Sequence, residues 1–291
     1  MRRHTCRTRP ACGDAIVVLA RADALRALDE DAGSGDLTAG LIDPQCSARA
    51  YVLVREPAVI CGRSWVDATV LELDPTAQLV WHVSDGERCV PGQVVLEMRG
   101  RAQALLTAER TALNFLQLLS AVATTTACYV AEVQGSRAQV VDTRKTLPGL
   151  RLAQKYAVRT GGGTNHRIGL YDAVLIKENH IAAAGGIAQV LARAAAAAAQ
   201  ADFVEIEVET LAQLAEALDA GARMVLLDNM DLPMLREAVQ LNQGRAVLEI
   251  SGGVTLEGLR SLAETGVDRI SVGSLTKDVK AIDFSMRFET L

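Results

Sequence analysis

The sequence lacks several features that would assign it to a common protein class. Its 291 residues include six cysteines, but they form no CxxC pair and have no histidine-rich partner segment of zinc-finger spacing. We therefore expect reduced thiols, as in a cytoplasmic protein. The basic start, Met1–Arg9, is followed by an apolar run too short for a secretory signal core, which leaves an organellar presequence as an alternative.

A basic surplus and a long apolar run are missing as well. The net charge is -5, and proteins that bind nucleic acid usually carry a concentrated basic face. The alanine-rich stretch 192–201 is interrupted by Arg193 and Gln200, so we find no run of the roughly 18 apolar residues that suggests a membrane span. These absences predict a chain without nucleic-acid or membrane partners.

What the sequence does have is enough apolar material for a large folded core. Hydrophobic residues make up 49% of the chain and charged residues 22%, which argues against disorder. The first hundred residues mix helical periodicity with short β-rich runs, such as 50–54 and 78–83. Leucines at helical spacing from 102 to 128 then predict long helices leading into a second unit. We place the domain boundary near residue 112.

From that point the chain is regular, with six apolar β-rich runs at 138–142, 172–176, 202–208, 223–227, 245–250 and 267–272. None alternates strictly, as expected of parallel strands that are buried on both faces, and each interval leaves room for a crossover helix. Repeated strand–helix units predict either a parallel α/β barrel or an open, doubly wound sheet.

The residues that follow these runs favour the barrel. Each run ends in a polar or glycine residue of chemical interest: Arg144 and Lys145, Lys177, Glu207, Asp228, Ser251-Gly252-Gly253, and Gly273-Ser274. In an α/β barrel all strand ends converge on one mouth, where such enzymes place their active sites. An open sheet would scatter the six ends along an edge, and no GxGxxG follows an early strand.

Two glycine turns after the last two strands favour phosphate binding. Ser251-Gly252-Gly253 and Gly273-Ser274 resemble the cups in which bare backbone N–H groups close around a phosphate dianion. Tight turns that need positive φ would explain either pair alone. The occurrence of two such turns after consecutive strands favours the phosphate interpretation.

Two carboxylates end neighbouring strands in otherwise apolar surroundings. Glu207 and Asp228 suit Mg²⁺ that carries a diphosphate, the stabilisation of a developing cation, or general acid and base roles. The alternative is an ion pair with Lys145 or Lys177 that only closes the barrel mouth.

Cationic side chains are concentrated between residues 142 and 180, in an otherwise acidic protein. The segments are Asp142–Arg151, Gly161–Arg167 and Lys177–His180, and Asp172 is the only acid between Thr143 and Ile176. A solvated surface would intersperse acids with the bases. The pattern therefore predicts a receptor for a small polyanion, with arginine forks for carboxylates and lysine as a point charge.

These residues resemble the quinolinate phosphoribosyltransferase family. The match is DTRKTLPGLRLAQKYAVRTGGGTNHRIGLYDAVLIKENHI, from Asp142 to Ile181, and shorter echoes include Glu109-Arg-Thr-Ala-Leu-Asn, Ile206-Glu-Val-Glu and Val272-Gly-Ser-Leu-Thr. The resemblance implies an N-terminal α/β sandwich domain (1–112, joined by 276–291) and an incomplete, about six-stranded α/β barrel (113–275). It also implies transfer of phosphoribosyl from phosphoribosyl diphosphate to quinolinate with loss of carbon dioxide, using Mg²⁺.

The resemblance also assigns roles to individual residues. It makes Lys145, Glu207 and Asp228 catalytic, the last two near Mg²⁺ directly or through water or diphosphate. It implies a homodimer with shared sites, in which Arg110 reaches the partner's site, and leaves a hexamer open. The quinolinate ligands are then Arg110, Arg144, His166, Arg167 and Lys177, and the phosphate ligands are Ser251, Gly252, Gly253 and Gly273.

Two other functions stay open on the residues alone. An aldolase would use Lys145 or Lys177, desolvated, to form a Schiff base. A barrel-derived binding protein would tolerate the loss of Glu207 and Asp228. A molybdenum-operon branch shares the implied fold but weakens the cationic set, which is intact here from Arg144 to Lys177.

Overall fold

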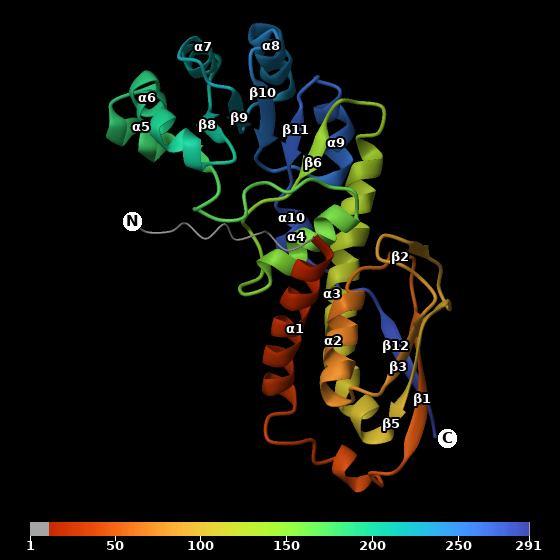
Figure 1. Ribbon diagram of the computed structural model, residues 1–291. Coiled ribbons are helices and arrows are strands. Elements are labelled where there is room, and N and C mark those ends of the chain that lie inside the picture. The colour runs from red at the N-terminus through yellow and green to blue at the C-terminus, as the bar shows by residue number, and fades with distance from the viewer. Residues whose placement is uncertain (1–11, 291) are drawn as a thin grey trace, which may run out of the picture. The chain divides into compact units, whose positions relative to one another are not determined.

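The computed structural model describes residues 12–290, which form two compact units (Figure 1). One unit combines 12–121 with 280–290, and the other comprises 122–279. The basic segment Met1–Arg9 lies outside the described residues. The long helix α3 (Ala102–Glu132) contributes residues to both units.

The first unit is built on a four-stranded antiparallel sheet in the order β12-β1-β5-β3. Its elements are α1 (Cys12–Asp31), the 3-10 turn Ala39–Leu41, β1 (Ser47–Val54), β2 (Ala58–Val59), α2 (Arg63–Leu73), β3 (Gln78–Trp81), β4 (Arg88–Cys89), β5 (Val94–Arg101) and β12 (Phe284–Thr290). Strands β2 and β4 form a separate two-stranded sheet. Because β12 pairs with β1, the end of the chain belongs to this unit (Figure 1).

Alternation along β1 explains how this sheet carries its helices. Ala48, Ala50, Val52 and Val54 are buried, whereas the residues between them are partly exposed. Val52 shares one small apolar cavity with Val66 of α2, so the buried face of the sheet packs against helix. The unit is therefore a two-layer α/β sandwich.

The second unit is built on a six-stranded parallel sheet in the order β6-β11-β10-β9-β8-β7. The strands are β6 (Gln139–Val141), β7 (Val174–Ile176), β8 (Val204–Val208), β9 (Met224–Asp228), β10 (Val247–Ser251) and β11 (Arg269–Ser271). Between them run α4 (Arg151–Thr160), α5 (Glu178–Ala184), α6 (Ile187–Ala197), the 3-10 turn Ala198–Gln200, α7 (Leu211–Asp219), α8 (Leu232–Asn242) and α9 (Leu256–Ala263), and α10 (Ser274–Lys277) follows β11.

All six apolar runs are strands, which confirms the predicted parallel sheet. Strands β6 and β7 follow one another in sequence but lie at the two edges of the sheet, where a closed barrel would pair them. Instead, β6 makes a single parallel bridge from Val141 to Thr164. The sheet is therefore an incomplete barrel with its gap between β6 and β7.

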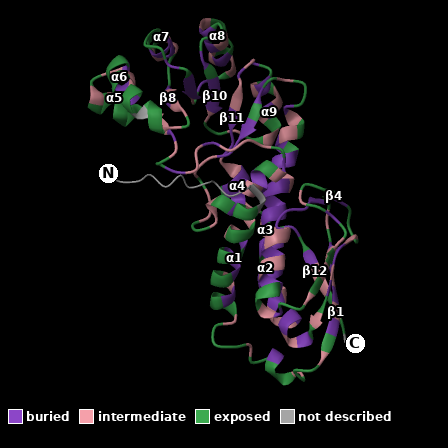
Figure 2. Cartoon of the chain, viewed as in Figure 1, coloured by how far each residue is buried: buried purple, intermediate pink, exposed green. Residues whose placement is uncertain are grey.

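Helix α3 corrects one expectation from the sequence. It is long and apolar enough, by length and composition alone, to cross a membrane, whereas we had found no such stretch. Of its most apolar 18-residue window, 61% is buried inside the protein, and Figure 2 shows buried residues along much of the helix. A core helix of a soluble protein passes the same test, so the helix is weak evidence for a membrane.

Candidate active site

Several predicted site residues of the second unit lie at the carboxyl ends of its strands, whereas His166 and Arg167 lie in the loop between α4 and β7. Lys177 follows β7 directly, and Asp228 and Ser251 are the last residues of β9 and β10. Glu207 is the next-to-last residue of β8. Since parallel strands place these ends at one edge of the sheet, the topology brings together residues as far apart in sequence as Lys177 and Ser251.

A cavity of about 410 Å³ joins the predicted phosphate cup to Lys145. Its walls include both glycine turns and Lys145. Lys145 packs so closely on Gly273 that a Cβ added to this glycine would lie 3.2 Å from Cδ of the lysine. The lining residues are Tyr129, Thr143, Lys145, Ser251, Gly252, Gly253, Val254, Thr255, Leu256, Glu257, Ser271, Gly273, Ser274, Lys277 and Asp278. The cavity has the size of small-molecule sites in general.

The turn after β10 has the backbone that an anion cup needs. Gly252 and Gly253 have φ of 101° and 58°, which only glycine adopts without strain. Thr255 then caps α9, with its hydroxyl accepting from the N–H of Gly258 at 3.4 Å. The turn therefore leads from the cavity into a helix N-terminus, where N–H groups and the helix dipole favour an anion.

Two arginines, one in the loop after β6 and one in the loop before β7, form a cationic pair. Burial lowers the pKa of Arg167, and the positive charge of Arg144 lowers it further, so the two guanidinium groups influence each other. Nε of Arg144 is buried and has no hydrogen-bond partner among the described residues. Two half-buried guanidinium groups in this arrangement suit a ligand that carries more than one carboxylate.

Lys177 and Glu207 form an ion pair, with Nζ 2.8 Å from Oε2. This is the pairing that we had weighed as the purely structural alternative. The side chain of Lys177 is still 46% exposed, and an ammonium group has two further protons to donate. The pairing therefore leaves the predicted role of Lys177 in ligand binding open.

The carboxylates of Glu207 and Asp228 offer hard oxygen donors of the kind that Mg²⁺ prefers. Oδ2 of Asp228 accepts a hydrogen bond of 2.7 Å from Asn229, and Lys177 already neutralises part of the charge on Glu207. No group of three metal-ligating side chains in residues 12–290 includes either carboxylate. The two carboxylates could hold Mg²⁺ only together with oxygens of a phosphate ligand or water, and the metal stays a prediction.

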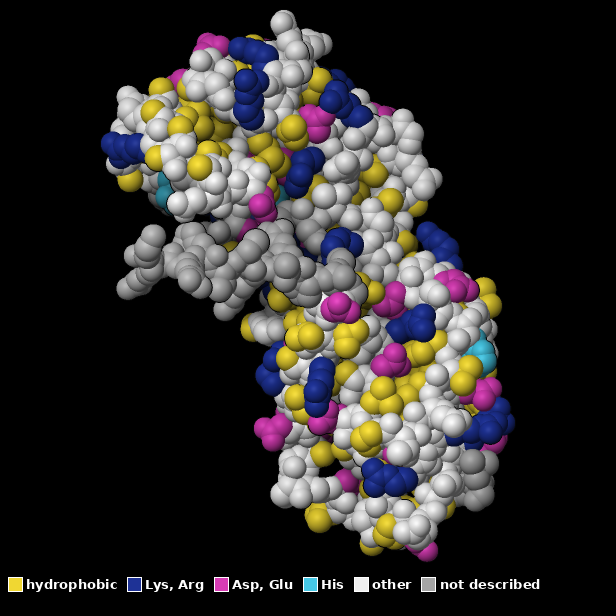
Figure 3. Space-filling view, viewed as in Figure 1, with side chains coloured by type: hydrophobic (Ala, Val, Ile, Leu, Met, Phe, Trp, Pro, Cys, Tyr) yellow, Lys and Arg dark blue, Asp and Glu magenta, His cyan; other side chains and the backbone are white. Residues whose placement is uncertain are grey.

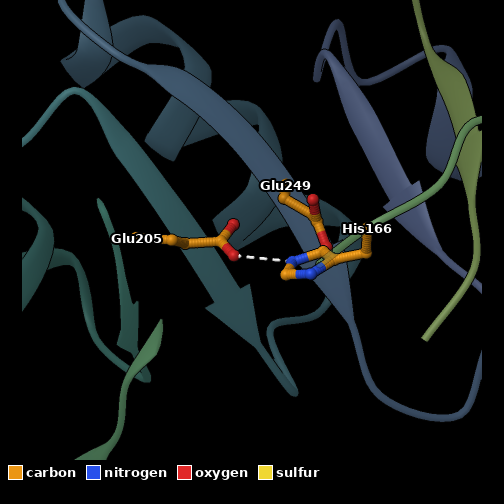
Figure 4. Close-up of side chains that lie close together, drawn as sticks. All are labelled: His166, Glu205 and Glu249. Atoms are coloured by element: carbon orange, nitrogen blue, oxygen red, sulfur yellow. Dashed lines mark hydrogen bonds and ion pairs between the residues drawn. The ribbon is translucent and has the colours of Figure 1, made fainter. Parts of the chain in front are cut away.

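His166 lies inside the barrel, 8% exposed, where it faces two buried acids on β8 and β10 (Figure 4). Its Nε2 is 2.8 Å from Oε2 of Glu205 and 3.5 Å from Oε1 of Glu249. Its Nδ1 accepts the backbone N–H of Arg167 at 2.8 Å. Because Nδ1 is an acceptor, the neutral ring carries its proton on Nε2 and donates it to Glu205.

Burial disfavours the charged form of all three side chains in this cluster. Burial raises the pKa of Glu205 to about 7, and burial followed by the charge of Glu205 raises the pKa of Glu249. Burial also lowers the pKa of His166, as do nearby cations, of which Arg269 is the strongest. The predicted contact of His166 with quinolinate stays a prediction, because in this structure both ring nitrogens already have protein partners.

Sequence reasoning missed Glu205 and Glu249 altogether. A signal was present, because Glu205 precedes Glu207 by two residues in a strand and must share its face. With His166 these acids offer three ligand atoms within 4.8 Å of one another, as a metal site would. However, Arg269 and Ser271 already bond to Glu249, Arg269 with Nε 2.8 Å from Oε2, so Glu249 is compensated without a metal ion.

The structure also bears on the two lysines of the aldolase alternative. A Schiff-base lysine needs a desolvated amine, but Lys145 and Lys177 are both exposed. Lys155 is buried, which the sequence did not suggest, but it forms an ion pair with buried Asp142. The geometry therefore gives no support to an aldolase.

Arg110 lies in the first unit, exposed on α3. No salt bridge or side-chain hydrogen bond of Arg110 occurs among residues 12–290, so its side chain is available to a ligand. Its assignment to a partner subunit's site depends on the dimer and stays a prediction.

Comparison with known proteins agrees with this geometry. Residues 36–120 match the N-terminal domain and residues 122–287 the C-terminal domain of the family described as quinolinate phosphoribosyl transferase. The chain is 44% identical over 271 residues to a nicotinate-nucleotide pyrophosphorylase [carboxylating] of Mycobacterium leprae, which covers 90% of this chain and 94% of the relative. It is 42% identical over 257 residues to a probable enzyme of the same name from Bacillus subtilis, covering 88% and 89%.

A solved structure extends the likeness to three dimensions. The nicotinate-nucleotide pyrophosphorylase of Francisella tularensis superposes with a TM-score of 0.90 at 42% identity, covering 94% of this chain and 97% of that one. The family match therefore holds for both units and for their fold, and the chain belongs to the quinolinate phosphoribosyltransferase family.

Proposed function

We propose that this protein transfers the phosphoribosyl group of phosphoribosyl diphosphate to quinolinate, forming nicotinate mononucleotide, diphosphate and carbon dioxide. The observation that carries the proposal is the cavity that joins Lys145 to the two glycine turns. Family membership and the names of the relatives support the same reaction.

The glycine turns are the proposed seat of the 5′-phosphate. Backbone N–H groups near Gly252, Gly253 and Gly273 can surround its oxygens, and the hydroxyls of Ser251 and Ser274 line the same cavity. With the phosphate anchored there, the ribose and the diphosphate extend toward Lys145. Its ammonium group stabilises the negative charge that develops as the diphosphate leaves.

The two carboxylates stabilise the positive charge that develops on the ribose. Breaking the bond between C1′ and the diphosphate oxygen makes the sugar cationic, and Glu207 and Asp228 lie at the same sheet edge with charges that favour this state. Magnesium, held by these carboxylates and the diphosphate, would neutralise the leaving group. The pyridine nitrogen then forms the new bond to C1′.

Quinolinate is oriented by the cationic side chains of the second unit. Arg144 and Arg167 supply two forks for the two carboxylates, and Lys177, paired with Glu207, is the third proposed cation. Once the ring nitrogen carries ribose, the ring is cationic and accepts the electron pair of the bond to the 2-carboxylate, which leaves as carbon dioxide. A proton then binds to the ring carbon that carried the 2-carboxylate.

We also propose a homodimer in which Arg110 completes the partner's site, and a cytoplasmic location. The location rests on cysteine chemistry, because Cys46, Cys89 and Cys128 are free thiols. The predicted absence of a nucleic-acid partner rests on the net charge of -5, and Figure 3 shows basic and acidic side chains interspersed over the face in view.

The direct test is to incubate purified protein with quinolinate, phosphoribosyl diphosphate and Mg²⁺ and to follow nicotinate mononucleotide and carbon dioxide. Nicotinic acid serves as the parallel substrate, and omission of Mg²⁺ tests the metal. We expect product from quinolinate alone, with carbon dioxide in equal amount. Product from nicotinic acid only, or from neither, would contradict the substrate assignment.

A further inference from the structure

Helix α4 carries two cationic side chains one turn apart, Arg151 and Lys155, that bond to both loops with predicted quinolinate ligands. One loop follows β6 and carries Arg144, and the other carries Arg167. Lys155 is 1% exposed, and Arg151 is half-buried. Residues four apart on a helix share a face, so the two cations act on the loops from the same side.

Lys155 links the two loops through a buried network of hydrogen bonds. Its Nζ forms an ion pair with Oδ1 of Asp142 and donates to the backbone oxygen of His166 at 3.0 Å. Oδ1 of Asp142 also accepts the backbone N–H of His166 at 2.8 Å. The side-chain amide of Asn165 donates to Oδ2 of Asp142 at 2.7 Å and to the backbone oxygen of Lys155 at 2.9 Å.

Arg151 ties the same loops together further along. Its guanidinium group donates to the hydroxyl of Thr146 at 3.1 Å, to the backbone oxygen of Ile168 at 3.2 Å and to that of Arg144 at 3.3 Å. The planar fork of arginine allows these three bonds at once, which a lysine could not reproduce.

The loops need such a restraint for two reasons. They lie at the open edge of the sheet, where β6 meets only the single bridge to Thr164 instead of a full strand. They also hold Arg144 and Arg167 against the repulsion of like charges. A buried ion pair such as that of Lys155 is a weak source of stability, because well-packed apolar residues often serve as well.

We propose that Arg151 and Lys155 are positioning residues for quinolinate, which hold Arg144 and Arg167 at the separation that its two carboxylates require. Neither side chain touches the substrate. The inference rests on the proposed function for the identity of the ligand. The restraint on the loops follows from the hydrogen bonds alone.

The first test compares wild-type protein with Arg151→Ala, Arg151→Lys and the control Arg260→Ala. Arg260 belongs to the same unit and, like Arg151, donates to a backbone oxygen, that of Gln134 at 2.8 Å. We expect Arg151→Ala to raise the KM for quinolinate by about tenfold or more and to leave the KM for phosphoribosyl diphosphate within about twofold, since small displacements of binding groups are costly. Arg151→Lys should recover part of the loss.

The second readout is hydrogen–deuterium exchange of peptides that cover 142–147 and 164–168, without any substrate. Arg151→Ala should speed exchange in both loops, whereas Arg260→Ala should leave them unchanged. For Lys155, the double variant Asp142→Asn with Lys155→Met avoids a lone buried charge, and we expect the same loosening and the same selective rise in KM.

If Arg151→Ala left both the exchange of the two loops and the KM for quinolinate at wild-type values, the proposal would be overturned. A fall in kcat with both KM values unchanged would overturn it as well, because loss of folded protein alone gives that result. If wild-type protein did not turn over quinolinate, the proposed function would fail, and the exchange measurement would still decide whether the two cations hold the loops.

Discussion

At the scale of single residues, Glu205 shows how burial and neighbours set the charge of a side chain. It is fully buried, and burial raises its pKa to about 7, against the opposing pull of Arg269 and Arg167. Its Oε1 has no hydrogen-bond partner among the described residues, while Oε2 faces His166. Near neutral pH this acid is therefore close to half protonated.

This pKa predicts a pH-dependent contribution to stability. An acid with a raised pKa in the folded state binds more protons there than in the unfolded chain, so its contribution is complete below its unfolded value near 4.5 and is lost as the pH rises through about 7. Relative to Glu205→Gln, wild-type protein should lose on the order of 2 to 3 kcal/mol between pH 5 and pH 8.

Urea unfolding at the two pH values measures the effect, with Glu237→Gln as the exposed control. Parallel pH profiles for wild type and Glu205→Gln would show that Glu205 keeps an ordinary pKa in the folded protein.

The sequence identified the exposed side chains of the site better than the buried ones. Lys177 follows β7 directly, Arg144 and Lys145 come shortly after β6, and strand ends can be read from apolar runs. Lys155 and Asp142 pair only because a loop and a helix meet, and no local pattern encodes that contact. Their burial is a tertiary property, which is why no role could be assigned to either residue from local patterns.

At the scale of elements, the turns after β9 and β10 interlock. Asn229 has a φ of 54°, and its N–H donates to the backbone oxygen of Ser251 at 3.3 Å. A Cβ on Gly252 would collide with the side-chain oxygen of Asn229. The phosphate turn is therefore shaped partly by its neighbour, in addition to its own positive φ.

This contact predicts that Gly252→Ala is costlier than a positive φ alone would make it. Gly244 has a φ of 76° and open space around it, so Gly244→Ala isolates the backbone cost of about 1 kcal/mol. Gly252→Ala should lose at least about twice that in free energy of unfolding and raise the KM for phosphoribosyl diphosphate. Equal losses for the two variants, with unchanged KM, would show that the turns do not depend on each other.

Most of the predicted strands are present, but a strand that pairs with two of them was not predicted. The runs at 50–54 and 78–83 correspond to β1 and β3, and the six later runs to the parallel sheet. Strand β5 was not anticipated, although it pairs with both β1 and β3. Apolar runs mark buried strands, but β5 ends in Arg99-Gly100-Arg101, and such polar strands depend on pairing for their identity.

At the scale of the whole molecule, the proposed dimer makes a prediction that needs no structure of the dimer. Arg110→Ala and Lys145→Ala should each abolish activity, because each removes a ligand of every site. If Arg110 serves the partner's site, mixed dimers regain one intact site, and reassembly of equal amounts should restore about a quarter of wild-type activity.

The measurement is activity after joint unfolding and refolding, with each variant refolded alone as the control. Activity that stays at the level of the separate variants would show that each subunit builds its site from its own residues.

The pairing of β12 with β1 has a consequence for how the protein is made. The sheet of the first unit needs residues 284–290, which are made after the whole barrel, to cover the edge of strand β1, which is made well before it. Throughout synthesis of the barrel, the partner edge of β1 therefore waits without its strand, and an unpaired edge is where chains aggregate. The growing chain must keep that edge protected until residues 284–290 have been made.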